Sequence, residues 1–138
     1  MKTLYTAHAT STGEGRNGHV RSDDGKLDLD LAVPKEMGGG GGKTNPEQLF
    51  AAGYAACFHN AMLFVARSEK LDMTGSTVDA DVAIGPNESG GFTLGVTLQV
   101  SVPGLDADKA RELVDKAHQV CPYSNATRGN IPVDLTLV

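Results

Sequence analysis

The sequence predicts an α+β fold built from antiparallel sheets and two helices. Three observations support this. Apolar residues alternate with polar ones in several segments, a long apolar stretch with helical spacing follows a glycine-rich loop, and a second amphipathic stretch lies near the end. The expected order is three strands, a helix, two strands, a helix and a strand, with no regular strand–helix–strand rhythm. At 138 residues we expect one domain spanning 1–138.

The first third of the chain is expected to form a small antiparallel sheet. In KLDLDLAV (26–33), leucine and valine alternate with charged residues, which is typical of a half-buried strand. Asp24 and Gly25 form a hairpin turn signal that pairs this strand with one over His19–Ser22. A weaker opening strand is expected over residues 3–9.

The glycine run at 38–42 predicts a loop and matches no phosphate-binding motif. After it, Asn45 is suited to cap a helix that begins at Pro46, and Thr44 with Glu47 also fits a capping box. This helix is apolar nearly all round up to Val65, so we expect a core helix covered on most sides. Its central His59 and Asn60 favour a buried helix over a membrane span.

The second half of the chain again shows strand-like alternation and a segment with helical spacing of apolar residues. Residues 77–84 and 92–102 alternate on either side of a turn at 85–91 and predict a hairpin, with Phe92 among the inward residues. A helix is expected from an Asp106 cap to Cys121, where Pro122 interrupts it. An alternating segment at 131–138 predicts the last strand.

Composition excludes some partners. The net charge is −5, the pI is about 5.2 and there is no basic run, so we expect neither nucleic acid nor an anionic membrane as a partner. The first residues lack an apolar signal core, so a cytoplasmic protein is expected. In that compartment a disulfide is usually transient and catalytic or redox-sensing.

The chain has two cysteines, Cys57 and Cys121. A free cysteine often serves as a small buried apolar residue. No spacing typical of a metal site is present, so we expect no metal. No oriented base is evident near Cys57 for a cysteine hydrolase. The residues alone leave open whether Cys57 fills a core or reacts.

Three motifs resemble the organic hydroperoxide resistance proteins, a branch of the OsmC-like family. They are TNPEQLFAAGYAACF (44–58), CPYSNATRGNIPVDLTL (121–137) and GEGRNGHVRSDDG (13–25). The CPYSNA form is similar to this branch rather than to its OsmC sister, and the resemblance covers essentially the whole chain. It implies an intertwined homodimer in which antiparallel β-sheets wrap long central helices, with active sites at the subunit interface.

The resemblance also implies roles for four residues. Cys57 would be the peroxidatic thiol and Cys121 the resolving thiol, while Arg16 would activate Cys57 and Glu47 would hold Arg16. The implied activity reduces alkyl and fatty-acid hydroperoxides to alcohols through a Cys57 sulfenic acid and a Cys57–Cys121 disulfide. A dihydrolipoyl group would be the reductant, and no bound cofactor is implied. A nearby guanidinium typically lowers the pKa of an acid by about 1–3 units, which would make Cys57 a thiolate.

Helix geometry constrains this site. On one straight helix, Glu47 and Cys57 would be roughly 15 Å apart and about 80° out of line. Either the helix breaks, with Gly53 as the hinge, or one of the two comes from a partner subunit.

The function has alternatives as well. The aromatic residues Phe50, Tyr54 and Phe58 would favour an apolar peroxide, or they form plain core. An OsmC-type stress protein with broader peroxide preference remains open, as does a redox sensor or ligand-binding module whose thiol pair switches a partner.

Overall fold

The computed structural model describes all residues from Met1 to Val138. The predicted α+β class is confirmed by two three-stranded sheets and three α-helices. The chain divides into two compact units, Met1–Leu49 and Phe50–Val138, each described in turn. The single domain over 1–138 stays a prediction. The elements are β1 (Ala9–Thr12), η1 (Gly15–Asn17), β2 (His19–Ser22), β3 (Asp28–Asp30), η2 (Lys35–Met37), α1 (Pro46–Glu69), β4 (Thr77–Pro86), β5 (Phe92–Ser101), α2 (Ala107–Val120), α3 (Pro122–Thr127) and β6 (Val133–Leu137).

The first unit holds the antiparallel sheet β1-β2-β3. The β2–β3 hairpin forms where expected, and Asp24 accepts hydrogen bonds from the Lys26 amide at 2.9 Å and from the Ser22 hydroxyl at 2.7 Å. The opening strand is Ala9–Thr12, so its predicted position over 3–9 is wrong. The strand predicted over 26–33 is only Asp28–Asp30, because the chain then leaves β2 and pairs Leu31 with Thr44.

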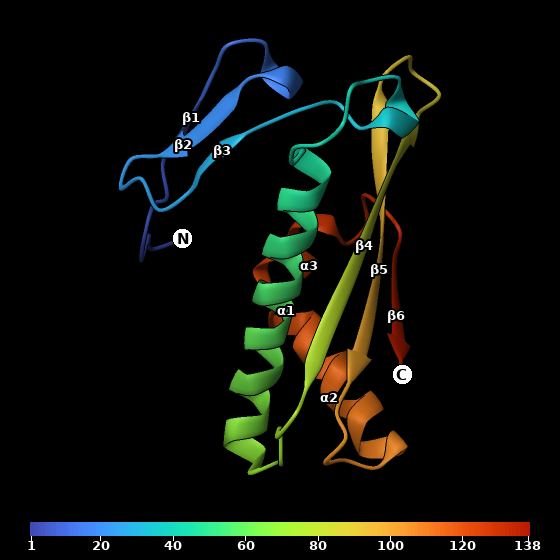
Figure 1. The fold of residues 1–138 in the computed structure, drawn as a ribbon. Coiled ribbons are helices and arrows are strands. Elements are labelled where there is room, and N and C mark those ends of the chain that lie inside the picture. The colour runs from blue at the N-terminus through green and yellow to red at the C-terminus, as the bar shows by residue number, and fades with distance from the viewer. The chain divides into compact units, whose positions relative to one another are not determined.

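The second unit is built on the hairpin β4–β5, which pairs from Thr77 with Ser101 to Pro86 with Phe92. The strand β6 joins the other edge of β5 and runs parallel to it, with Val96 beside Val133 (Figure 1). This sheet is therefore mixed: its hairpin is antiparallel as predicted, and the last strand, whose partner the sequence did not specify, is parallel. The chain returns through α2 and α3 before it enters β6, and such a helical crossover is what a parallel pair requires.

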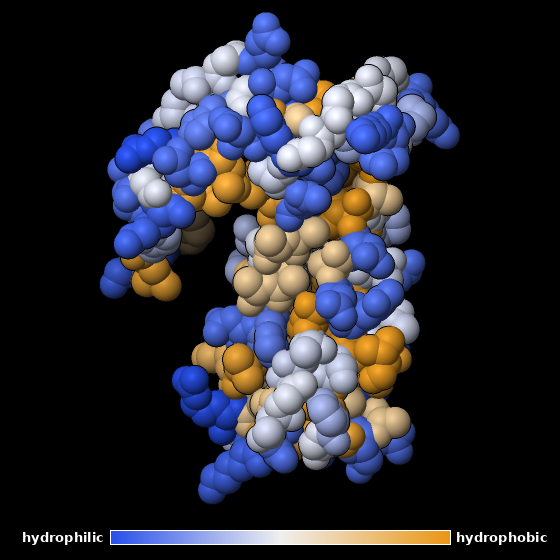
Figure 2. Space-filling model, in the orientation of Figure 1, coloured by the Kyte–Doolittle hydropathy of each residue, from blue (hydrophilic) through white to orange (hydrophobic).

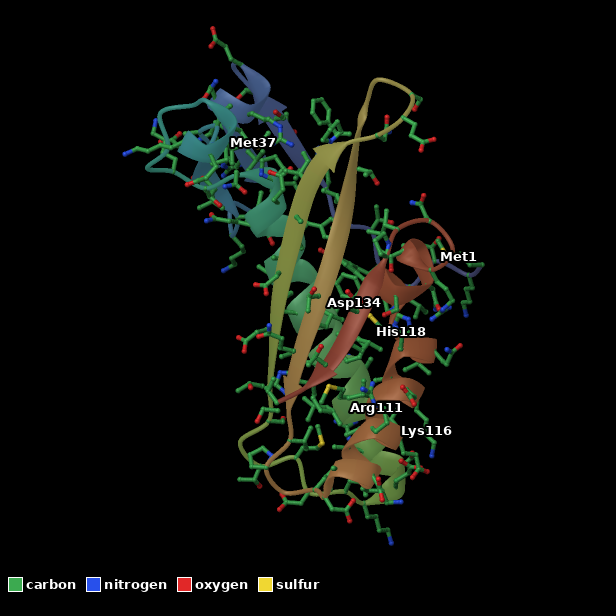
Figure 3. The ribbon with its side chains drawn as sticks, turned by 90° about the vertical axis from the view of Figure 1, so that its right-hand side faces the viewer. Met1, Met37, Arg111, Lys116, His118 and Asp134 are labelled. Atoms are coloured by element: carbon green, nitrogen blue, oxygen red, sulfur yellow. The ribbon has the colours of Figure 1, made fainter.

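The helices α1 and α2 lie on the same face of this sheet (Figures 1 and 3). The core between them contains Leu98, Val100, Leu113 and Met62, all fully buried. As predicted, Asp106 caps α2: its side chain accepts a hydrogen bond from the Lys109 amide at 2.8 Å. Phe92 was expected to point inward, but it is 71% exposed at the end of the hairpin.

The long helix α1 buries only one side. Its buried residues include Tyr54, Phe58 and Met62, whereas Leu63 and Phe64 are 38% and 65% exposed. Figure 2 shows apolar surface over the middle of α1. The expectation that α1 is covered on most sides is therefore wrong for the single chain.

Helix α1 is long and apolar enough to cross a membrane by length and composition, a property that interior helices of globular proteins share. In its most apolar 18-residue window, 28% of the residues are buried. Its buried side packs against the sheet in the core of the second unit, as an interior helix does.

Candidate thiol site

The two cysteines meet within one chain. Their Sγ atoms are 3.6 Å apart, both thiols are free, and Cys121 is fully buried whereas Cys57 is partly exposed. Cys57 lies in the middle of α1, and Cys121 lies between α2 and α3.

The predicted helix interruption at Pro122 is confirmed. The Cys121 amide still donates to the Ala117 carbonyl, but its backbone is extended (φ −66°, ψ 122°) and Pro122 opens a new helix, α3. A proline disfavours helical backbone at the residue before it and is favoured at the first helical position. Cys121 is therefore held at a fixed break in the chain, facing α1.

The residues of the second unit that surround Cys57 do not activate it. Burial raises the pKa of the Cys57 thiol, and the backbone of Tyr123 offsets this only in part. The neighbouring Cys121 thiol raises the pKa further. Thiolate is the nucleophilic form, so a peroxide-reactive Cys57 needs a cation or further hydrogen-bond donors beside it.

A small apolar pocket opens beside Cys57. Its volume is about 280 Å³. Its lining residues are Cys57, Asn60, Ala61, Phe64, Val120 and Pro122. Sequence reasoning missed Phe64, Val120 and Pro122 as site residues; the helical spacing of Ala61 and Phe64 after Cys57 is the signal that points to two of the lining residues.

The three aromatic rings named from the sequence do not line this pocket. Tyr54 and Phe58 are fully buried, and Phe50 packs edge-on against Tyr54 with ring centroids 6.2 Å apart. Tyr54 and Phe58 therefore form core, and Phe50 is partly buried and packs against that core.

Arg16 and Glu47 form a bidentate ion pair within the first unit. The two guanidinium nitrogens donate to the two carboxylate oxygens at 2.8 and 2.6 Å. This pairing is the first cause of a lowered Glu47 pKa and a raised Arg16 pKa. Arg16 lies in the short helix η1 and Glu47 in the first turn of α1.

The start of α1 explains why Glu47 is available to Arg16. The Gln48 amide donates to the Asn45 side chain at 2.8 Å, so Asn45 is the cap and Pro46 the first helical residue, as predicted. The capping box of Thr44 with Glu47 is not formed, since Thr44 bonds Gln48 and Glu47 bonds Arg16.

Gly53 is not a hinge. Helix α1 runs without interruption from Pro46 to Glu69. A Cβ atom at Gly53 would lie 2.9 Å from the Tyr123 hydroxyl and 3.2 Å from its ring, so the glycine allows α3 to approach α1 closely. The other alternative, that Glu47 and Cys57 serve one site from different subunits, stays a prediction.

Sequence reasoning also missed a chain of hydrogen bonds behind the thiols. The Tyr54 hydroxyl is 2.9 Å from Ser124 Oγ and 3.2 Å from Thr127 Oγ1, and Ser124 Oγ is 2.8 Å from His118 Nδ1. Figure 3 labels His118 near the C-terminal end of α2. Desolvation lowers the pKa of His118. No group of three or more histidine, cysteine, aspartate or glutamate side chains is arranged to hold a metal ion.

Comparison with known proteins places this geometry in a family. The sequence profile of the OsmC-like proteins matches residues 38–136. The organic hydroperoxide resistance protein of Xanthomonas axonopodis pv. citri (strain 306) is 59% identical, over 99% of this chain and 96% of the relative. The organic hydroperoxide resistance protein OhrB of Bacillus subtilis (strain 168) is 51% identical, over 97% of this chain and 98% of the relative.

Solved structures agree. The organic hydroperoxide resistance protein of Elizabethkingia anophelis matches with a TM-score of 0.95 and 55% identity, over 99% of this chain and 98% of its own. An OsmC-like protein of Vibrio cholerae is only 18% identical, with a TM-score of 0.78, and shares the fold. The chain belongs to the OsmC-like family, and within it to the organic hydroperoxide resistance branch.

Proposed function

We propose that this protein is a cysteine peroxidase that reduces organic hydroperoxides to alcohols and so protects against organic peroxide stress. The observation that carries the proposal is the pair of free thiols 3.6 Å apart in one chain, with Cys57 opening into an apolar pocket. The names of the high-identity relatives support the substrate class. An alkyl or fatty-acid chain suits the pocket formed by Ala61, Phe64 and Val120 better than hydrogen peroxide does.

The proposed reaction has three steps. The Cys57 thiolate attacks one peroxide oxygen, the O–O bond breaks, and the departing alkoxide takes a proton to become the alcohol, leaving a sulfenic acid on Cys57. The Cys121 sulfur then attacks the Cys57 sulfur, a disulfide forms, and the hydroxyl leaves with a proton as water. A dihydrolipoyl dithiol reduces this disulfide and becomes a cyclic disulfide itself.

Arg16 is the proposed activator of Cys57. Burial raises the pKa of Cys57, and a guanidinium beside the sulfur would lower it, since it stays charged throughout the working pH range. Glu47 takes two of the roughly five N–H donors of Arg16, which leaves about three for the thiolate and the peroxide. Glu47 therefore orients Arg16 without using all of its donors.

A homodimer is part of this proposal. The outward side of α1 carries Leu63 and Phe64, and large apolar surface of this kind usually marks an interface. A second copy placed there would let Glu47 and Cys57 of one unbroken helix serve different sites. We propose that the enzyme works as this dimer in the cytoplasm, where reductants recycle the disulfide.

A steady-state assay with dihydrolipoamide tests the proposal. The wild-type protein is expected to consume an alkyl hydroperoxide and to prefer it to hydrogen peroxide. The Cys57→Ser protein is expected to show no turnover, because no other group is placed to form the sulfenic acid. Substantial consumption of hydroperoxide by Cys57→Ser, or none by the wild type, would overturn the assignment. If the wild-type protein does not turn over hydroperoxide but its Cys57 and Cys121 thiols can still be oxidised, the result would favour a redox sensor.

A further inference from the structure

Behind the two thiols, a second contact joins α1 to α3. The Tyr54 hydroxyl lies 2.9 Å from Ser124 Oγ and 3.2 Å from Thr127 Oγ1, and Tyr54 and Ser124 are both completely buried. Tyr54 is absent from the lining of the pocket beside Cys57. Its hydroxyl therefore serves the packing of α3 rather than contact with a peroxide in that pocket.

The Tyr54–Ser124 contact and the Cys57–Cys121 contact occur at matching positions along the two segments. Tyr54 precedes Cys57 by three residues on α1, and Ser124 lies in α3, three residues after Cys121, which is the residue that caps α3. Residues three apart on a helix face the same side. The pairs Cys57–Cys121 and Tyr54–Ser124 are thus neighbouring contacts about one turn apart, between segments that run in opposite directions.

Helix α3 depends on such contacts for its position. It has six residues, far too few for a helix that is stable by itself, and the break at Cys121 and Pro122 separates it from α2. The Tyr54 hydroxyl bonds both Ser124 and Thr127, one turn apart along α3. It therefore fixes the rotation and the axial position of α3 on α1.

We propose that Tyr54 is a positioning residue for the disulfide-forming step, which rests on the proposed function. In that step the Cys121 sulfur bonds the Cys57 sulfur and the sulfenic hydroxyl leaves with a proton as water. The sulfurs must close from 3.6 Å to a bond of about 2.05 Å, so a small rotation of α3 decides whether attack succeeds. The first step, attack on peroxide, uses Cys57 and its pocket, to which α3 contributes only its first two residues, Pro122 in the wall and the Tyr123 backbone beside the thiol. It therefore depends less on the rotation of α3 than the closure of the two sulfurs does.

The substitution Tyr54→Phe separates the two steps. It leaves no buried hydroxyl unpaired, since Ser124 keeps its contact with His118 and Thr127 keeps the Tyr123 carbonyl at 3.0 Å. Reduced protein is mixed with excess alkyl hydroperoxide and quenched at intervals. Mass analysis then counts sulfenic acid, after capture by a 1,3-dione, together with intrachain disulfide and sulfinic acid.

We expect Tyr54→Phe to oxidise Cys57 within about twofold of the wild-type rate. Disulfide formation should slow by roughly three- to tenfold, the factor that corresponds to one net hydrogen bond. The surviving sulfenic acid should then give more sulfinic acid. Tyr5→Phe is the matched control, because it removes a phenolic hydroxyl from a residue that is 81% exposed, and both steps should keep the wild-type rates.

Several results would overturn the inference. If Tyr54→Phe forms the disulfide at the wild-type rate, the inference is wrong and the peroxidase proposal is unaffected. If Cys57 oxidation and disulfide formation slow equally, Tyr54 only contributes to packing and does not position Cys121. A wild-type protein that never forms the Cys57–Cys121 bond would remove the peroxidase mechanism and this inference together.

Ser124→Ala removes the Tyr54–Ser124 contact from the α3 side, together with the contact of Ser124 with His118, and must show the same separation of steps; it also serves if Tyr54→Phe does not fold. Because the two variants share the Tyr54–Ser124 contact, the double variant should slow disulfide formation by less than the product of the two single effects. Fully multiplying effects would refute a coupling of Tyr54 with Ser124 in this step.

Discussion

Replacing Gly53 with alanine distinguishes a site of close approach from an ordinary helix position. Alanine is favoured over glycine inside a helix by about 1 kcal/mol. At an uncrowded position in an unbroken helix, Gly53→Ala would therefore raise the free energy of unfolding by that amount.

The neighbouring ring of Tyr123 is expected to remove this stabilisation or to turn it into a destabilisation. The new Cβ would lie 2.9 Å from the Tyr123 hydroxyl oxygen and 3.2 and 3.3 Å from two ring carbons. Ordinary contact is about 3.5 Å or more, so the ring must withdraw by roughly half an ångström. Tyr123 packs against Tyr54 and Phe50, with centroids 5.7 and 6.1 Å away, so its withdrawal loosens those contacts. Overpacking typically costs about 1–3 kcal/mol, which leaves Gly53→Ala between neutral and about 2 kcal/mol destabilising.

Urea unfolding at fixed protein concentration measures the effect. In a Tyr123→Leu background the obstructing ring is gone, so the same Gly53→Ala change should now stabilise the protein by about 1 kcal/mol. A stabilisation of about 1 kcal/mol in both backgrounds would refute the close-approach explanation.

Three further predictions concern the proposed site. Arg16→Ala should raise the Cys57 pKa and reduce activity at neutral pH, with partial recovery at higher pH; an unchanged thiol titration would remove Arg16 from the site. Cys121→Ser should react once with peroxide, accumulate sulfenic acid and overoxidise, whereas wild type should lose about two hydrogens per chain in one intrachain cross-link; only intermolecular bridges would contradict this. Glu47 has a lowered pKa, first through its bond to Arg16, so its contribution is present above its unfolded pKa of about 4.3 and is lost as pH falls through the lower folded value. Arg16 is partly exposed, which limits this contribution to about 1 kcal/mol or less, and Glu47→Gln should flatten the acid side of the stability curve; an unchanged curve would show that the pair adds nothing.

The positions of the strands and their buried sides could be predicted from the sequence better than whether neighbouring strands run parallel or antiparallel. Alternation located β4, β5 and β6 within a few residues, because one side of each strand must be covered by helices. Alternation does not encode direction, so the parallel pairing of β6 with β5 could not be predicted from it. Phe92 has the right spacing for the core, but it lies where the hairpin ends, and periodicity carries no information about how far a covering helix extends.

The site was predictable only where a local motif carried it. The motifs around Cys57 and Cys121 led to the two thiols that the structure brings together. The contacts of Gly53 and Tyr54 depend on where α3 docks, which no single segment specifies. For this reason the sequence offered Gly53 as a hinge, as one of two alternatives, and did not indicate its close approach to α3; the Tyr54 ring was recognised without its hydroxyl contact.

Helix α1 is apolar nearly all round because its two sides have different contacts. One side packs against the sheet and carries Tyr54 and Phe58, so the core of the second unit accounts for it. The other side has no such cover, and Phe64 is exposed there although it also lines the pocket beside Cys57. A partner that covers this side would therefore also complete a wall of the pocket beside Cys57. Assembly and substrate binding would then depend on the same apolar residues, which is a physical reason for Cys57 to lie between the two sides of the helix.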